Sequence, residues 1–183
     1  MAPESLLRRT PLGPLADHLQ RICAGPRFSC REDAFRALSD VRCAEGADLD
    51  AVEAVGATLP AIGRLTSIGG TLVLGLGPRW WMVDASEGSP AVVEAPRVAA
   101  VDISAQRTPL VMRGDAVRQV LSHGTSLDVH PDYFPVGSCA QTLLAKTGVV
   151  LARTAEDEYR VWVRASFARY LGAWIIDASV EYR

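Results

Sequence analysis

The sequence predicts an α+β fold in which antiparallel sheets pack against helices. Strand-like segments follow one another through most of the chain, separated by glycine-rich or polar turns. In residues 158–164, Tyr159, Val161 and Val163 alternate with more polar positions, which is typical of a sheet with two unlike faces. The chain then closes with an amphipathic helix, and strands closed by helices on one side form an α+β domain.

Residues 1–51 are predicted to form an irregular leader with short helices. Pro14 can open a helix that a Gly-Pro pair ends near residue 25. Its apolar face consists of Leu15, Leu19 and Ile22. A second short helix is expected over residues 32–38, followed by a small, acidic connection over residues 42–50.

Residues 52–183 are predicted to form the main domain. Strands are expected over residues 55–59, 64–68, 71–74, 80–83, 98–103 and 108–113. Glycine pairs and Gly-Pro supply the turns between the early strands, and residues 87–96 are expected to form a loop.

The second half of this domain is predicted to be a helix, three strands and a final helix. Gly114 and Asp115 start the first helix, which ends near Gly124. Antiparallel strands follow over residues 140–145, 149–153 and 158–164. Ser166 can cap the final helix. Its apolar stripe consists of Phe167, Tyr170, Leu171, Trp174, Ile175 and Ala178.

Composition excludes several functions. The 183 residues suit one domain or one domain with an appendage, and a formal net charge of -2 provides no basic surface for nucleic acid or an anionic membrane. No apolar run approaches the roughly 20 residues that cross a bilayer. The four cysteines form no CxxC pair, so reduced thiols and a cytoplasmic location are expected.

The order of several short motifs is more specific than any one of them. These motifs are Gly114-Asp-Ala116, Leu127-Asp-Val129, Gly137 and the strand pair leading to 156–163. Together they resemble the folate-binding domain of the glycine-cleavage T-protein and its relatives. Within that group the chain is similar to the gamma subunit of heterotetrameric sarcosine oxidase over residues 52–182. This similarity is carried by Leu76-Gly-Pro78 with Trp80 or Trp81, by Asp102-Ile-Ser104, and by Arg164-Ala-Ser166-Phe-Ala168 leading to Tyr170-Leu171 and Trp174.

The resemblance implies a fold of the T-protein type and a place in a larger assembly. Its other members would be alpha, beta and delta subunits, which oxidise sarcosine or a related N-methyl amine at a flavin, with folate accepting the one-carbon unit. FAD, FMN, NAD, zinc and tetrahydrofolate are expected on those subunits. This chain is expected to contribute scaffold and interface, with no catalytic, cofactor-binding or metal-binding residues of its own.

One departure from the T-protein pattern supports the hypothesis that this chain is not catalytic. In the T-protein an acidic pair follows the glycine of a strand turn, whereas here Gly148 is followed by residues 149–153, which read Val-Val-Leu-Ala-Arg. General acid/base catalysis therefore has no candidate at this place. Two alternatives remain open: a free-standing folate-dependent methylene or methyl transferase, and a folate-binding assembly factor.

The candidate interface residues are Arg79, Trp80, Trp81, Arg160, Trp162 and Arg164. Neighbouring Trp80 and Trp81 must point to opposite faces of a strand, so an outward indole can anchor a partner unless helices or the leader cover both faces. Arg160 and Arg164 lie on the same side of their strand as Trp162, and this side is either a solvated rim or a contact with an acidic neighbour. A contact with an acidic neighbour is also a hypothesis for Arg79 and Arg107.

Other possible sites have weaker support. His123, Asp128, His130 and Asp132 lie close in sequence, but their spacing matches no zinc signature, and a solvated loop with an Asp128-capped turn explains them better. The glycines near residue 75 lack the third glycine of a dinucleotide loop.

Overall fold

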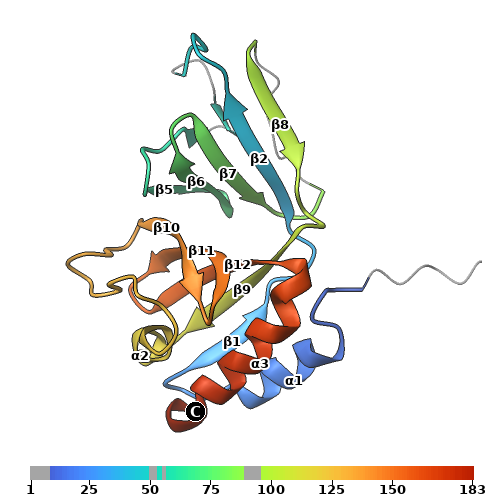
Figure 1. The fold of residues 1–183 in the computed structure, drawn as a ribbon, viewed down its shortest axis with the longest axis vertical. Coiled ribbons are helices and arrows are strands. Elements are labelled where there is room, and N and C mark those ends of the chain that lie inside the picture. Colours follow the sequence, from blue (N-terminus) through green and yellow to red (C-terminus); the bar gives the residue numbers. More distant parts are fainter. Residues whose placement is uncertain (1–8, 50–52, 55–56, 89–95) are drawn as a thin grey trace, which may run out of the picture.

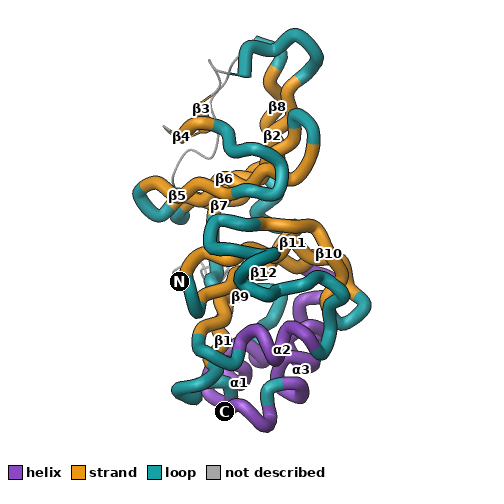
Figure 2. The backbone as a smooth tube through the Cα atoms, turned by 90° about the vertical axis from the view of Figure 1, so that its left-hand side faces the viewer, coloured by secondary structure: helices purple, strands orange, loops and turns teal. Residues whose placement is uncertain are grey.

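The computed structural model describes residues 9–49, 53–54, 57–88 and 96–183. These residues form three stacked layers (Figures 1 and 2): a sheet at the top, a second sheet in the middle and helices below. The upper layer, here the outer sheet, has the strand order β5-β6-β7-β2-β8. The middle layer, here the central sheet, has the order β1-β9-β12-β11-β10. The architecture is thus α+β with antiparallel sheets, as the sequence predicts.

The elements have the following bounds. The strands are β1 (Ser29–Glu32), β2 (Ala37–Cys43), β3 (Glu53–Ala54), β4 (Ala57–Thr58), β5 (Leu65–Ile68), β6 (Thr71–Gly77), β7 (Trp80–Ala85), β8 (Val98–Asp102), β9 (Arg107–Arg113), β10 (Cys139–Leu144), β11 (Thr147–Ala155) and β12 (Glu158–Arg164). The helices are α1 (Pro14–Ile22), α2 (Val117–Ser122) and α3 (Ala168–Ala178), with short 3₁₀ turns η1 (Ala165–Phe167) and η2 (Val180–Tyr182).

The main core lies between the central sheet and the helices. Tyr159, Val161 and Val163 of β12 are buried there, together with Leu171 and Ile175 of α3. Because alternate residues of a strand face opposite sides, Trp162 of the same strand enters a second core between the two sheets. The predicted two-faced strand is confirmed.

A third apolar cluster covers the far face of the outer sheet. Val41, Val73, Trp81 and Val83 form it, and Leu59 packs against it. In the middle of the outer sheet both faces are therefore covered, which explains why the burial of β6 and β7 is almost continuous, whereas the edge strands β5 and β8 are more exposed.

The predicted helix over residues 32–38 is wrong. Glu32 ends β1, which pairs with β9, and residue 37 begins β2, which lies between β7 and β8. Phe35 has a φ of 61°, a left-handed conformation that breaks a helix and turns the chain between the two sheets. The helical spacing of apolar residues here is a local coincidence that long-range strand pairing overrides.

The leader therefore supplies a strand to each sheet. Helix α1 occupies the predicted place, but β1 and β2 are ladder strands rather than irregular chain. The predicted connection over residues 42–50 starts within β2, which runs to Cys43. In the described residues, the segment before residue 51 is thus continuous with both sheets.

Most other predicted elements are confirmed with small changes of boundary. Part of the predicted strand 55–59 and most of the predicted loop 87–96 lie outside the described residues. Ser166 does not cap α3, because η1 precedes the helix and Phe167 occupies the cap position without a side-chain hydrogen bond. None of the helices in the described ranges is long and apolar enough to cross a membrane.

Candidate functional site

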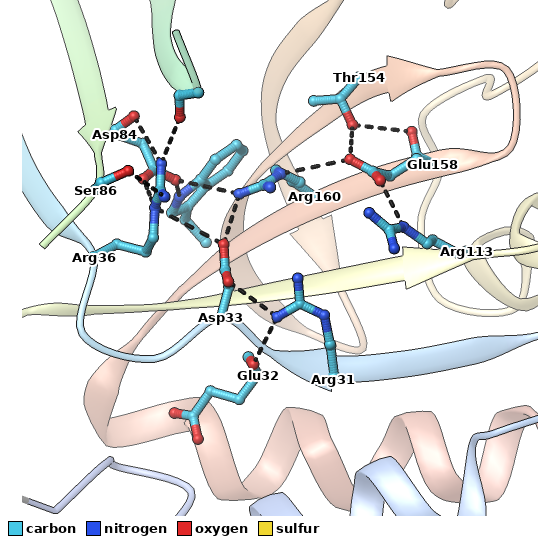
Figure 3. Close-up of polar contacts among 12 residues, drawn as sticks. Arg31, Glu32, Asp33, Arg36, Asp84, Ser86, Arg113, Thr154, Glu158 and Arg160 are labelled. Carbon is cyan, nitrogen blue, oxygen red and sulfur yellow. Dashed lines mark hydrogen bonds and ion pairs between the residues drawn. The ribbon is translucent and has the colours of Figure 1, made fainter.

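Partly buried ion pairs around one fully buried carboxylate join the outer sheet to the central sheet (Figure 3). The fully buried carboxylate of Asp84 on β7 accepts hydrogen bonds from Arg36 Nε at 2.6 Å and from Trp162 Nε1 at 2.7 Å. Asp33, between β1 and β2, accepts from Arg160 at 2.9 Å and lies 3.8 Å from Arg36. We call Asp33, Arg36, Asp84, Arg160 and Trp162 the junction network.

The network continues across neighbouring strands of the central sheet. Glu158 accepts hydrogen bonds from Arg113 Nε at 2.6 Å and from Thr154 Oγ1 at 2.8 Å, and its carboxylate lies 3.7 Å from Arg160 Nε. Arg31 donates to Asp33 at 3.0 Å. Carboxylates and guanidiniums therefore alternate from Asp84 to Glu158 (Figure 3).

Burial and charge act in opposite directions on these carboxyl groups. Burial raises the pKa of Asp84, outweighing the opposing effects of Arg36, Trp162 and Arg160. For Asp33, burial alone would raise the pKa, but the Arg31 hydrogen bond and the neighbouring guanidiniums outweigh it and lower the pKa. The pKa of Glu158 is lowered in the same way, against the effect of burial, by Thr154, Arg113 and Arg160. Each carboxylate is held by neighbours, which suits a structural clamp better than a proton carrier.

A second polar cluster lies where the sheets meet solvent. Trp80 Nε1 donates to Asp40 Oδ2 at 2.9 Å, and the Arg42 guanidinium stacks 3.9 Å above the Trp80 ring. Arg42 Nε also donates to Asp40 at 2.8 Å. Trp80 is only partly buried, so this stacked face reaches the surface.

The structure separates the predicted interface residues into two groups. Trp81 and Trp162 are buried, and their indole N–H groups donate to Pro60 O and Asp84, so the prediction that they present a surface is wrong. Strand alternation turns Trp162 into the core between the sheets and Trp81 into the third cluster on the far face of the outer sheet. The acidic neighbour of Arg160 is Asp33 of this same chain.

The remaining candidates lie at or near the surface. Trp80 and Arg79 are partly buried, and Arg164 is exposed. Arg79 has a φ of 53° in the turn before β7 and donates to Ala44 O at 2.7 Å. An interface role for Arg79, Trp80 and Arg164 stays a prediction.

Sequence reasoning missed the junction network. Asp84 carries a usable signal, because a charged residue on the inward face of an apolar strand needs a buried partner. Asp33 and Arg36 carry none, since they fall in the segment with helical spacing. The contact of Asp33 with Arg160 joins positions 127 residues apart and exists only in the folded chain.

The strand after Gly148 does not fit folate chemistry. Val149, Val150, Leu151 and Ala152 of β11 are all buried in the two cores. The guanidinium of Arg153 at its end donates to Phe134 O at 3.2 Å and to Glu156 O at 2.8 Å. Aliphatic side chains inside a core neither bind a pterin nor transfer a proton, so this strand has no residue that fits folate chemistry.

The histidine loop has the predicted turn. Asp128 accepts a hydrogen bond from the backbone N–H of His130 at 2.9 Å, and His130 Nδ1 lies 3.5 Å from Asp132. His123 instead contacts the Tyr182 hydroxyl at 3.3 Å. Across the described ranges, His, Cys, Asp and Glu side chains form no group of three or more that could hold a metal ion.

Comparison with known proteins identifies the family. The model of the "Sarcosine oxidase, gamma subunit family" matches residues 42–181. The chain belongs to this family. Proteins named sarcosine oxidase subunit gamma from Corynebacterium sp. strain U-96 and strain P-1 are 34% and 35% identical to it, covering 100% and 96% of this chain and 95% and 92% of those proteins.

Solved structures agree with the family assignment. A chain of the heterotetrameric sarcosine oxidase from Corynebacterium sp. U-96, in complex with pyrrole 2-carboxylate, superposes with a TM-score of 0.83 at 32% identity, covering 96% of both chains. The aminomethyltransferase T of the glycine cleavage system from Bartonella henselae superposes with a TM-score of 0.61 at 14% identity, covering 92% of this chain and 50% of that one. The gamma-subunit fold is therefore of the T-protein type.

Proposed function

We propose that this chain is the gamma subunit of a heterotetrameric sarcosine oxidase-type complex. The complex would oxidatively demethylate sarcosine or a related N-methyl amine, with folate as one-carbon acceptor. The observation that carries the proposal is the similarity to a chain of a heterotetrameric sarcosine oxidase over 96% of both chains. Similarity over nearly the full length of both proteins supports an equivalent place in an assembly.

Within this complex we propose a structural and interface role beside alpha, beta and delta subunits. General acid/base catalysis needs an ionisable group that can reach a substrate proton. Here the carboxylates of the junction network are held by arginines, and the strand after Gly148 is aliphatic and buried. These observations support the proposal that FAD, FMN, NAD, zinc and tetrahydrofolate bind to the other subunits.

The surface side chains Arg79, Trp80 and Arg164 are proposed to contact those subunits. Trp80 with the stacked Arg42 is partly exposed, and tryptophan and arginine are among the residues most enriched in interface hot spots. A cytoplasmic location is also proposed, supported by four cysteines that are all free thiols.

Co-expression tests the function directly. A tagged full-length chain is produced with the remaining subunits of a sarcosine oxidase-type complex from the same source. We expect the tag to retain a flavin-bearing complex that oxidises sarcosine or another N-methyl amine. The chain purified alone is expected to show neither oxidation nor methylene transfer to tetrahydrofolate.

Two results would contradict the proposal. Turnover of an aminomethyl donor by the chain alone would indicate a free-standing transferase. Tight tetrahydrofolate binding by the chain, with no retention of a flavin-bearing subunit, would indicate a folate-binding assembly factor.

A further inference from the structure

Four positions form a row across one end of the central sheet. Leu143 of β10 lies opposite Gly148 of β11, and Arg164 of β12 lies opposite Arg107 of β9. The pairing of Val149 with Val163 places Gly148 beside Arg164. Since cross-strand neighbours share a face and alternate residues switch faces, the row lies on the same side of the sheet as Trp162. We call these four residues the arginine row.

The outer sheet does not cover the arginine row, which is open to solvent. Leu143 is 58% exposed, and Gly148 and Arg164 are also exposed. A Cβ atom placed on Gly148 would meet nothing within 4 Å. Two neighbouring hollows of about 360 and 370 Å³ are both lined by Arg107 and Arg164, and the first is lined by the whole row.

The row carries positive charge without an ion pair among the described residues. Arg107 and Arg164 face each other directly, and like charges in this position destabilise a sheet. In the described part of the chain neither guanidinium has a carboxylate within 4.0 Å, and Arg107 donates only to Trp162 O at 3.4 Å. Burial and the charge of Arg164 lower the pKa of Arg107, opposed by the charge of Asp40. Asp40 itself is held by Trp80 and Arg42.

The shape of the row favours an extended occupant. Three inter-strand spacings separate Leu143 from Arg107, about 14 Å, which is the length of about four extended residues. Gly148 lets a backbone approach closely, and Leu143 offers an apolar contact at one end. A small anion would leave most of this length empty.

We propose that the arginine row binds an extended acidic segment of a partner subunit, with a carboxylate bridging Arg107 and Arg164. This inference rests on the proposed function, because it names the contact by which the gamma subunit joins its complex. Carboxylates pair with guanidiniums through short, charge-assisted hydrogen bonds, so the contact would relieve the repulsion between the arginines.

Two variants with different chemistry test the row. Arg164→Glu reverses an exposed charge, and Gly148→Trp fills the floor of the row where the structure has open space. For both we expect the Kd for the purified remaining subunits to rise at least about tenfold. Arg164→Lys, which keeps the charge, is expected to bind more tightly than Arg164→Glu. Binding of the unmodified chain should weaken from about 50 mM to about 500 mM NaCl, and Arg164→Glu should lose most of this dependence.

Matched controls place the same changes elsewhere. Arg21→Glu reverses an exposed charge on α1, beyond the other face of the central sheet, and Ser67→Trp introduces the same indole at an exposed position of β5. Both are expected to bind like the unmodified chain. Circular dichroism and melting temperature confirm that each variant is folded.

The outcomes separate this inference from the proposed function. If the unmodified chain fails to bind the remaining subunits, the proposed function is wrong. If it binds, and Arg164→Glu and Gly148→Trp bind equally well, only the arginine row is wrong. A chain that is dimeric alone and becomes monomeric with Arg164→Glu would show that a second copy occupies the row, which also overturns the inference.

Discussion

Gly114 is a position where the backbone, and not side-chain chemistry, requires glycine. Its φ is +120°, and a Cβ atom at this position would lie 2.1 Å from the carbonyl oxygen of Arg27. The residue therefore meets two independent requirements, a backbone conformation that favours glycine and a close approach to the chain before β1.

Substitution of this glycine gives a residue-level prediction. Gly114→Ala is expected to destabilise the protein by at least about 2 kcal/mol, from backbone strain and from the contact with Arg27 O. Gly148→Ala is the matched control, because its Cβ meets nothing and its φ is not in the left-handed region. Urea denaturation of both variants measures the difference. Equal midpoints would contradict this account of Gly114.

At the scale of elements, the turn between β1 and β2 links the two sheets. Asp33 in this turn contacts Arg160 of β12, and Arg36 contacts Asp84 of β7. Each ion pair joins the turn to a different sheet. The turn therefore fixes the relation of the sheets through directional contacts, in addition to the apolar core between them.

The lowered pKa of Asp33 predicts how pH affects this link. A carboxyl group whose pKa is lower in the folded state stabilises the fold above its unfolded value, about 4, and loses that effect as pH falls through its folded value. Asp33→Asn is therefore expected to cost about 1–3 kcal/mol at pH 7. This difference from the unmodified chain should shrink as pH falls from about 5 to about 3. Thermal unfolding across this pH range measures it.

Asp132→Asn is the control, since Asp132 is 80% exposed in the histidine loop. We expect it to change stability by less than about 0.5 kcal/mol throughout. A difference for Asp33→Asn that stays constant down to pH 3 would contradict the assigned role of its charge. Asp84 contributes with the opposite sign, because its raised pKa makes the fold less stable as pH rises through its folded value.

At the scale of the whole molecule, the chain order ties both sheets to the N-terminal segment. Strand β2 lies between β7 and β8, and β8 has no other strand partner among the described residues. Strand β1 forms one edge of the central sheet, and α1 packs against β1 and α3. Removing this segment would take one strand partner from each of β7, β8 and β9 and would uncover part of the main core.

A fragment of residues 52–183, which the sequence predicts as the main domain, tests this dependence. We expect it to lose cooperative thermal unfolding, because an unpaired β8 and an uncovered core leave too little buried surface. A fragment of residues 9–183, which keeps α1, β1 and β2, is expected to unfold like the full chain. Cooperative unfolding of residues 52–183 at the same temperature would instead establish a separate leader and domain.

The candidate site was only partly predictable from sequence. The aliphatic strand after Gly148 is a local feature that the structure confirms. The turn predicted at Gly148 lies instead at Ala145 and Lys146, which both have positive φ, and Gly148 is part of β11 opposite Leu143.

The sequence does not decide which of Trp80 and Trp81 points into a core, because strand alternation says only that the two side chains lie on opposite faces. The third apolar cluster, with Leu59 packed against it, and the hydrogen bond to Pro60 O decide it by burying Trp81.

The sequence by itself determined the strand and helix order from residue 64 onward, since period-two and period-3.6 patterns with glycine turns are local signals. The short motifs in that region also determined the family. Only the tertiary structure decided that residues 29–32 and 37–43 form strands, that Asp33 meets Arg160, and that Arg107 faces Arg164. Such contacts join residues that are far apart along the chain, so their free energy appears only when the sheets assemble.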